Sequence, residues 1–224
     1  MGLTLVIGNK NYSSWSFRPW IAMKVAGIPF EEVLIPIYRE GSREKFLSYS
    51  PAGKVPILLD GEATIWESLA ILEHLADRFP EKKLWPDDMV ARAHARAISA
   101  EMHSGFVPLR RACPMNMWRP VIKRALNADV QANVARIDAM WSDCRKRFGK
   151  AGPFLFGKFT AADAMYAPVV SRFHTYAVDV SAPSRAYIDA VMALPAFREW
   201  HAAGVKEEWV LEEDEVDWPK VLKA

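Results

Sequence analysis

The signals for β-strands in this chain lie in its first third, and this uneven distribution restricts the folds open to it more than any other feature. Asp60-Gly61 separates two of the apolar runs and is typical of a tight hairpin. Runs typical of strands occupy 3–7, 30–37, 55–59 and 63–66, and helical stretches are predicted at 16–26, 42–47 and 67–79. The predicted order is strand, helix, strand, helix, strand, strand, helix, with the first two strands parallel.

Beyond this region the pattern is helical. Residues 81–88 combine prolines with clustered charges and are predicted to link two domains. From Leu126 to Phe148, apolar residues recur every three or four positions, as on the buried face of a helix. The predicted fold class is therefore an α/β domain at 1–80 followed by an all-α domain at 89–224.

The end of the chain carries weaker signals. Thr160 and Asp163 form a variant of the helix-capping pattern and predict a helix that runs to about Tyr176. Shorter helices are predicted at 184–193 and 195–203. The acidic tail, 205–224, is predicted either to pack through its tryptophans, Trp209 and Trp218, or to remain partly loose.

Composition excludes several classes of protein. With 51% hydrophobic and 25% charged residues, the chain is expected to form a soluble globule, and no stretch is long enough to cross a bilayer. No signal peptide is recognised, so we expect a cytoplasmic protein. Cys113 and Cys144 lie far apart without ligand spacing, so no disulfide or metal site is predicted. Basic residues are scattered, which argues against nucleic acid or a membrane as partners.

A serine-rich loop between the first strand and the first helix is the strongest candidate for a functional site. Ser13 and Ser14 precede a helix that is predicted to begin at about Ser16, its candidate N-cap, and to end at Gly27. Hydroxyls and free backbone N–H groups at a helix N-terminus favour an anion. We therefore predict that this loop binds a thiolate.

Three motifs extend this interpretation. Ser13-Ser14-Trp15-Ser16 follows the first strand, Lys54-Val55-Pro56 precedes the third, and Glu67-Ser68 opens the third helix. In this combination and spacing the chain resembles the cytosolic glutathione transferase family, most closely the serine-type zeta class. The resemblance implies a thioredoxin-like N-terminal domain, an all-helical C-terminal domain, glutathione as co-substrate and a homodimer.

The resemblance also implies roles for individual residues. Ser13 would donate its hydroxyl proton to the glutathione thiolate, with Ser14 as the alternative donor, unless both serines only cap the helix. Val55 and a cis Pro56 would present the Val55 backbone to the cysteinyl part of glutathione. Ser68 would bind the γ-glutamyl carboxylate of glutathione, Glu67 its ammonium group and Lys54 the glycyl carboxylate. Each of these residues is also compatible with a structural role.

The second substrate is expected between the serine loop and the first long helix of the C-terminal domain. Candidate pocket residues are Trp15, Met102, Phe106 and Arg110, followed by Met115 and Trp118, although such a stripe also occurs in cores. Arg110 could attract an acidic electrophile. The histidines of the helical domain are interpreted as non-catalytic.

Two departures from the zeta pattern bear on the reaction. Trp15 stands where zeta isomerases have cysteine, and Thr175 stands at the offset of their arginine, with Arg172 nearest. We therefore predict a detoxifying transferase that conjugates glutathione to a hydrophobic electrophile. The alternatives are a glutathione-dependent isomerase or peroxidase on the same site, or a non-catalytic binding protein of the same fold.

Overall fold

The four predicted strands form one sheet in the computed structural model, which describes residues 2–224. Its order is β2-β1-β3-β4, with β1 parallel to β2 and antiparallel to β3, and with β3 antiparallel to β4. The strands are β1 (Leu3–Ile7), β2 (Phe30–Leu34), β3 (Ile57–Asp60) and β4 (Ala63–Trp66). Strand β2 is shorter than predicted because Pro36 has no N–H to extend the ladder, whose last bond runs from Ile35 N–H to Ile7 O.

Three helices accompany this sheet, namely α1 (Ser14–Ala26), α2 (Ser42–Tyr49) and α3 (Ser68–Arg78). The prediction that Ser16 caps α1 was wrong. Ser13 is the N-cap, because its Oγ accepts a hydrogen bond from Ser16 N at 3.4 Å. Gly27 ends the helix as predicted, in the left-handed conformation with φ of 63° that favours glycine.

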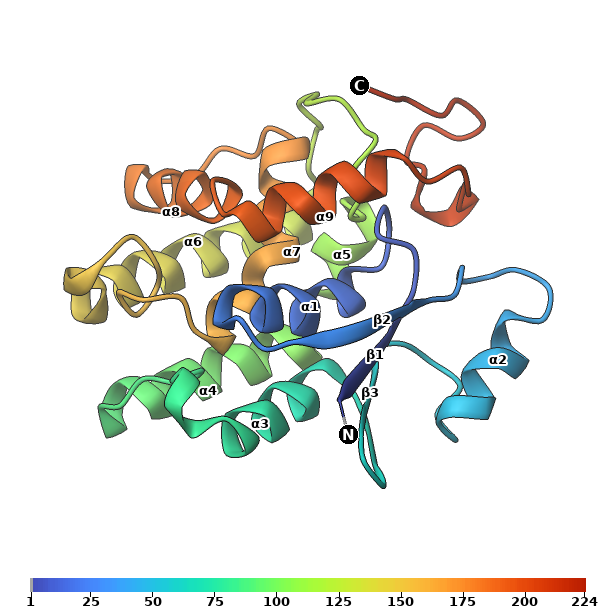
Figure 1. The fold of residues 1–224 in the computed structure, drawn as a ribbon. Coiled ribbons are helices and arrows are strands. Elements are labelled where there is room, and N and C mark those ends of the chain that lie inside the picture. Colours follow the sequence, from blue (N-terminus) through green and yellow to red (C-terminus); the bar gives the residue numbers. More distant parts are fainter. Residues whose placement is uncertain (1) are drawn as a thin grey trace.

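A helical unit follows the short 3₁₀ turn Pro80–Lys82. Its helices are α4 (Met89–Ser104), α5 (Val107–Ala112), α6 (Ala128–Phe148), α7 (Ala161–Thr175), α8 (Ala182–Met192) and α9 (Pro195–Val205), with further 3₁₀ turns at Gly149–Ala151 and Glu212–Asp214. The predicted fold class, a thioredoxin-like α/β unit followed by an all-helical unit, is confirmed (Figure 1). The boundary at 81–88 stays a prediction.

One hydrophobic core joins the two units. It includes Leu5 and Ile7 of the sheet, Phe17 of α1, and Val169 and Phe173 of α7, all of which are buried. Helix α1 lies between the sheet and the helices α7 and α9 (Figure 1). The loop that precedes α1 is therefore held in place by the sheet on one side and by the helical unit on the other.

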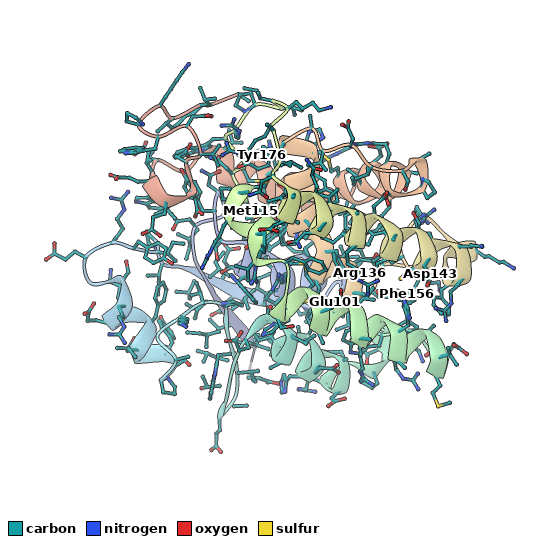
Figure 2. The ribbon with its side chains drawn as sticks, turned by 180° about the vertical axis from the view of Figure 1, so that it is seen from behind. Glu101, Met115, Arg136, Asp143, Phe156 and Tyr176 are labelled. Carbon is teal, nitrogen blue, oxygen red and sulfur yellow. The ribbon has the colours of Figure 1, made fainter. Side chains whose placement is uncertain are left out.

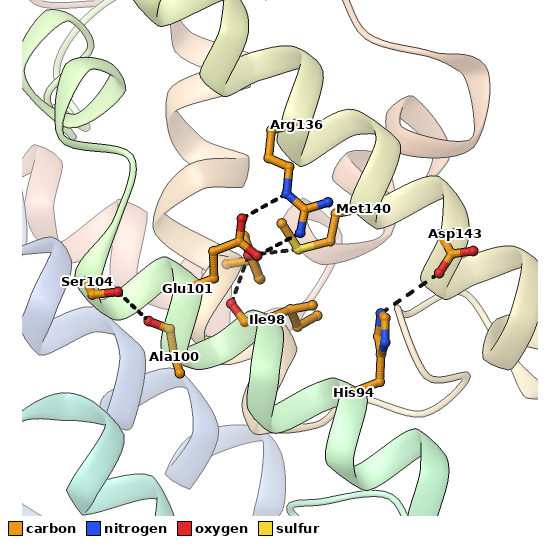
Figure 3. A network of polar contacts seen from close by, with 9 residues as sticks. His94, Ile98, Ala100, Glu101, Ser104, Arg136, Met140 and Asp143 are labelled. Atoms are coloured by element: carbon orange, nitrogen blue, oxygen red, sulfur yellow. Dashed lines mark hydrogen bonds and ion pairs between the residues drawn. The ribbon is translucent and has the colours of Figure 1, made fainter.

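Polar contacts position α4 and α7 within the helical unit. Arg136 of α6 donates two hydrogen bonds of 2.8 Å to the Glu101 carboxylate of α4, and Tyr166 of α7 donates to Ile98 O at 3.0 Å (Figure 3). The predicted capping box of α7 is present, with Asp163 Oδ2 accepting from both Thr160 N and Thr160 Oγ1 at 2.8 Å. These contacts fix the helices that face the serine loop.

The acidic tail packs differently from the prediction. Trp218 is 47% exposed, whereas Leu211 and Glu215 are buried. Glu215 Oε1 accepts hydrogen bonds from Tyr12 Oη at 2.7 Å and from Asn116 Nδ2 at 2.8 Å. A buried carboxylate with two donors therefore anchors the tail, which returns toward the start of the chain next to the serine loop.

Candidate active site

Two adjoining cavities lie beside the serine loop, and they share Trp15, Lys54 and Val55. The smaller, of about 310 Å³, is completed by Ala52, Pro56, Trp66, Glu67 and His103. The larger, of about 670 Å³, is lined by the serine loop and residues of both units: Tyr12, Ser13, Ser14, Ile37, Tyr38, Arg39, Ser42, Arg43, Phe46, Gly53, Arg110, Pro114, Met115, Arg172 and Asp214. Such paired cavities can hold two molecules side by side.

The serine loop presents a connected set of donors to the larger cavity. Ser13 Oγ donates to Ser16 Oγ at 2.8 Å, and Ser16 Oγ also accepts from Gly8 N at 3.0 Å. The Trp15 backbone N–H has no hydrogen-bond acceptor among residues 2–224, and neither does the Ser14 hydroxyl. Both are free to donate to an anion at the start of α1, where the helix dipole favours negative charge.

The Val55–Pro56 peptide bond is cis, in the position that the motif predicted. Neither the N–H nor the C=O of Val55 pairs with another backbone group in the described part of the chain. Since Val55 lines both cavities, its unpaired backbone groups are available to an extended peptide, which would bind as an added strand.

Glu67 occupies a strained backbone position at the start of α3. Its φ of 69° is rare for a residue with a side chain, and such strain occurs frequently at ligand sites. The exposed carboxylate lies 3.5 Å from His103 Nε2, with both residues lining the smaller cavity. Desolvation lowers the pKa of His103, although the charge of Glu67 opposes this shift.

Ser68 does not line either cavity. Its hydroxyl is fully buried, where it accepts from Arg18 Nη1 at 3.3 Å and lies 3.9 Å from Met165 Sδ. The backbone N–H of Ser68, at the first position of α3, is the group left for an anion. The sequence predicted a hydroxyl contact here, and the structure instead directs that hydroxyl into the core.

Trp15 stands between two guanidinium groups at the junction of the cavities. Arg18 lies 4.2 Å from its ring centroid and Arg110 lies 5.4 Å from it, while His103 packs edge-on at 5.2 Å. Burial lowers the pKa of Arg110 and lowers that of Arg18 to about 9, where the nearby charge of Arg172 adds to the effect. A basic environment therefore surrounds the indole.

Three of the predicted pocket residues lie elsewhere. Trp118 is buried in a separate cluster with Tyr12 and Leu211 and lines neither cavity. Met102 and Phe106 are buried in the main core and line neither cavity. Helix α4 ends at Ser104, and Phe106 has a left-handed φ of 58°, so the helical spacing that suggested one apolar face does not continue. Met115 does line the larger cavity. It lies on the loop that follows α5 (Figure 2), and this loop is held in place because Tyr176 Oη donates to Pro114 O at 3.0 Å.

The structure adds residues that sequence reasoning missed or set aside. Arg172 and Asp214 both line the larger cavity. Arg172 carried a signal, since it is the one charged residue within the mostly apolar stretch 164–173. Asp214 carried none, because it reaches the cavity only through the fold of the tail.

Other kinds of site find no support in the described residues. No group of three or more His, Cys, Asp or Glu side chains between residues 2 and 224 could hold a metal ion. Over the same range, none of the helices is both long and apolar enough to span a bilayer. Cys113 and Cys144 are buried and unbridged, and burial raises the pKa of both thiols.

A thioredoxin-like sheet unit joined to a helical unit, with two cavities at the junction, defines the architecture of a glutathione-binding transferase. Comparisons with known proteins agree. A family model described as the glutathione S-transferase N-terminal domain matches residues 12–78, and the corresponding C-terminal domain model matches 124–203.

Individual relatives and structures give the same result. The rat maleylacetoacetate isomerase is 31% identical over 200 residues, which are 84% of this chain and 88% of that protein. A probable maleylacetoacetate isomerase of Caenorhabditis elegans is 39% identical over 97 residues, covering 43% of this chain and 45% of the relative. A glutathione transferase homologue from Burkholderia, crystallised with glutathione, matches 93% of this chain and 100% of its own, with a TM-score of 0.68 and 22% identity.

The chain belongs to the glutathione S-transferase family, since the two domain models together cover more than half of it. The predicted family, fold, enzyme class and co-substrate glutathione are thereby confirmed. The roles of individual site residues stay predictions, which the geometry described above supports to different degrees.

Proposed function

We propose that the enzyme conjugates the glutathione thiolate to an electrophile and that Ser13 stabilises this thiolate. The observation that carries the proposal is the Ser13 hydroxyl on the wall of the larger cavity, which lies beside the unpaired Trp15 N–H and donates to the Oγ of the buried Ser16 at 2.8 Å. When sulfur binds, Ser13 turns its proton to the thiolate and Ser16 donates to Ser13 in return. Such a chain of hydrogen bonds strengthens each of its members.

The reaction follows from this stabilisation. A free thiol has a pKa of about 8.5, and lowering it by two units requires about 2.7 kcal/mol. A hydroxyl donor to a charged acceptor supplies about 1.5 to 3 kcal/mol, and a helix N-terminus adds about 0.3 to 2 kcal/mol. The thiol proton passes to solvent, the sulfur lone pair forms a bond to the electrophilic carbon, and the leaving group departs with its electron pair.

The smaller cavity would hold the γ-glutamyl end of glutathione. We assign Glu67 to its ammonium group and the backbone N–H of Ser68 to its carboxylate, since both stand at the start of α3. The unpaired backbone of Val55 would bind the cysteinyl residue between the two cavities. Lys54 is exposed beside both cavities and would approach the glycyl carboxylate.

A second candidate is glutathione-dependent isomerisation. The rat relative is named a maleylacetoacetate isomerase, and Arg172 lines the larger cavity even though Thr175 stands at the sequence offset of the isomerase arginine. In that reaction the thiolate would add to a double bond and leave again after rotation about the resulting single bond. The Trp15 side chain in place of cysteine argues against it.

Retention on immobilised glutathione combined with turnover of 1-chloro-2,4-dinitrobenzene tests the proposal. We expect the wild type to be retained and active, and Glu67→Gln to be retained more weakly because it cannot pair with the ammonium group. Retention without conjugation or isomerisation would instead indicate a binding protein. Absence of retention would contradict the assignment of the smaller cavity to glutathione.

We further propose a cytoplasmic homodimer. Trp66, at the end of β4, and Met89 and Val90, at the start of α4, are 43%, 72% and 56% exposed, and large exposed apolar groups of this kind support a protein contact. The free, buried thiols fit a reducing compartment. Sedimentation velocity should give the mass of a dimer that Trp66→Glu weakens, whereas a monomeric wild type would contradict the proposal.

A further inference from the structure

Glu207, just beyond the end of α9, binds the backbone of the serine loop. Its Oε1 accepts a hydrogen bond from Lys10 N at 2.7 Å, and its Oε2 accepts one from Asn11 N at 2.9 Å. Among residues 2–224, no backbone carbonyl accepts from either of these N–H groups. Lys10 and Asn11 are only 9% and 0% exposed. One carboxylate from the other end of the chain therefore satisfies two buried donors of the loop.

These two N–H groups lie within the turn that positions Ser13. Ser13 N donates to Asn9 O at 2.8 Å, which closes the turn over Lys10 and Asn11. Asn11 is also fixed through its side chain, whose Oδ1 accepts from Met117 N at 2.6 Å. A shift of the backbone at Lys10 or Asn11 would therefore move the Ser13 hydroxyl on the wall of the larger cavity.

The last turn of α9 presents Glu207 to the loop at close range. Gly204 is buried there, and a Cβ at this position would lie 3.1 Å from both Asn11 N and Lys10 C. Gly204 O accepts from Trp118 Nε1 at 3.1 Å and from Glu207 N at 3.2 Å. The helix thus approaches the loop so closely that a residue with a side chain would displace it.

The Lys10 side chain has partners of its own, so the contact of Glu207 with this residue is to the backbone. The Lys10 ammonium pairs with Glu32 Oε1 at 2.7 Å and lies 5.2 Å from the ring centroid of Trp20 and 5.6 Å from that of Trp200. A third cavity, of about 400 Å³, borders Lys10 and Glu207. If the carboxylate were removed, water from this cavity would replace its oxygens, which keeps the donors satisfied but leaves the loop without a fixed partner.

We propose that Glu207 is a positioning residue for glutathione conjugation, which holds the serine loop in the place where the Ser13 hydroxyl meets the thiolate. The inference rests on the proposed function, since it concerns the same donor. Glu207 lines neither of the two cavities assigned to the substrates, so its effect has to pass through the loop. A misplacement of about 1 Å costs up to about 100-fold in rate, and a loop that only sometimes leaves its position loses part of that factor.

Glu207→Ala and Ser13→Ala, alone and combined, form a double-mutant cycle that tests the proposal. We would measure kcat/KM for 1-chloro-2,4-dinitrobenzene at saturating glutathione, and the pKa of the bound glutathione thiol from the ultraviolet absorbance of the thiolate. Glu207→Ala should lower kcat/KM about 3- to 10-fold and raise the thiol pKa by about 0.5 to 1, because the donor is no longer fixed. In the Ser13→Ala background the same change should have less than about a 2-fold effect, since no hydroxyl is left to position.

Glu208→Ala is the matched control, since Glu208 is the exposed neighbour of Glu207 and lines neither substrate cavity. Its rate and thiol pKa should equal those of the wild type. Gly204→Ala reaches the same contact by another route, because its methyl group would push Asn11 away from the carboxylate, and it should change both quantities as Glu207→Ala does. Exchange of the Lys10 and Asn11 amide hydrogens measures the contact itself and should become faster in Glu207→Ala only, not in Glu208→Ala.

The cycle separates a positioning role from a general loss of structure. If Glu207→Ala lowers kcat/KM by the same factor with and without the Ser13 hydroxyl, or leaves the thiol pKa at its wild-type value, the proposal is overturned.

The thiol pKa also separates this proposal from the proposed function. If the wild type ionises bound glutathione but conjugates no electrophile, the proposed function fails and the thiol pKa decides alone. A rise in Glu207→Ala that is absent in the Ser13→Ala background would then support the positioning role, and no rise would overturn it. If Ser13→Ala loses rate while Glu207→Ala keeps the wild-type rate and thiol pKa, the positioning role fails and the conjugation stands.

Discussion

Replacing Ser13 by alanine is expected to lower kcat/KM for the electrophile, measured at saturating glutathione, by about 10- to 150-fold. The loss corresponds to about 1.5 to 3 kcal/mol, the contribution of a hydroxyl donor to a charged acceptor. In the structure this hydroxyl is linked to Ser16 Oγ at 2.8 Å, and Ser16 is in turn fixed by Gly8 N at 3.0 Å. A donor held in place in this way loses little freedom when the thiolate binds.

Ser14→Ala is the informative comparison. The Ser14 hydroxyl lines the same cavity but has no hydrogen-bond partner among residues 2–224, so it is not oriented in advance. We expect its loss to reduce the rate by less than about 5-fold, an effect below 1 kcal/mol. The pH dependence of kcat/KM should also shift to higher pH in Ser13→Ala, because the bound thiol ionises less readily.

The opposite result would reassign the role. If Ser13→Ala keeps the wild-type rate and pH profile while Ser14→Ala loses both, the donor is Ser14. Ser13 also caps α1 by accepting from Ser16 N, and loss of such a cap costs about 1 kcal/mol of stability. Thermal unfolding of each variant therefore has to accompany the kinetics, so that a rate is compared only between folded enzymes.

Much of the fold could be predicted because its signals are local. The hairpin turn at Asp60-Gly61, the left-handed cap at Gly27 and the capping box of Thr160 and Asp163 each depend on residues within a few positions of one another. The C-terminal end of β2 was harder to predict from the sequence, because the effect of Pro36 on the strand depends on which strand lies beside it. The cap of α1 was misassigned because three serines within four positions offer competing hydroxyls.

The candidate site was predictable where short motifs define it and not where distant segments meet. Ser13, Val55 and Glu67 were named from motifs, and all three line cavities in the structure. Met102 and Phe106 were assigned from helical spacing alone, which does not reveal where a helix ends. Asp214 enters the cavity only because Glu215 is bound by Tyr12, about two hundred residues away in the sequence.

Replacing Asp163 by alanine is expected to lower the free energy of unfolding by about 3 kcal/mol. Asp163 is fully buried, and its carboxylate accepts from Leu155 N at 3.0 Å and from Thr160 N and Thr160 Oγ1 at 2.8 Å. Alanine would leave two buried backbone N–H groups without an acceptor, each of which costs about 1 to 3 kcal/mol. Burial raises the pKa of Asp163 to about 6, so removing the buried charge offsets part of this loss.

Equilibrium unfolding in urea measures the effect, and Asp129→Ala supplies the control. Asp129 lies in the first turn of α6, as Asp163 does in α7, but it is exposed, so its loss should cost less than about 1 kcal/mol. The loss in free energy of unfolding for Asp163→Asn should fall between those of the two alanine variants, because asparagine keeps one acceptor oxygen. Since α7 packs against α1 and carries Arg172, loosening its start should also weaken glutathione conjugation. Equal stability of the two alanine variants would show that the capping box does not hold α7 in place.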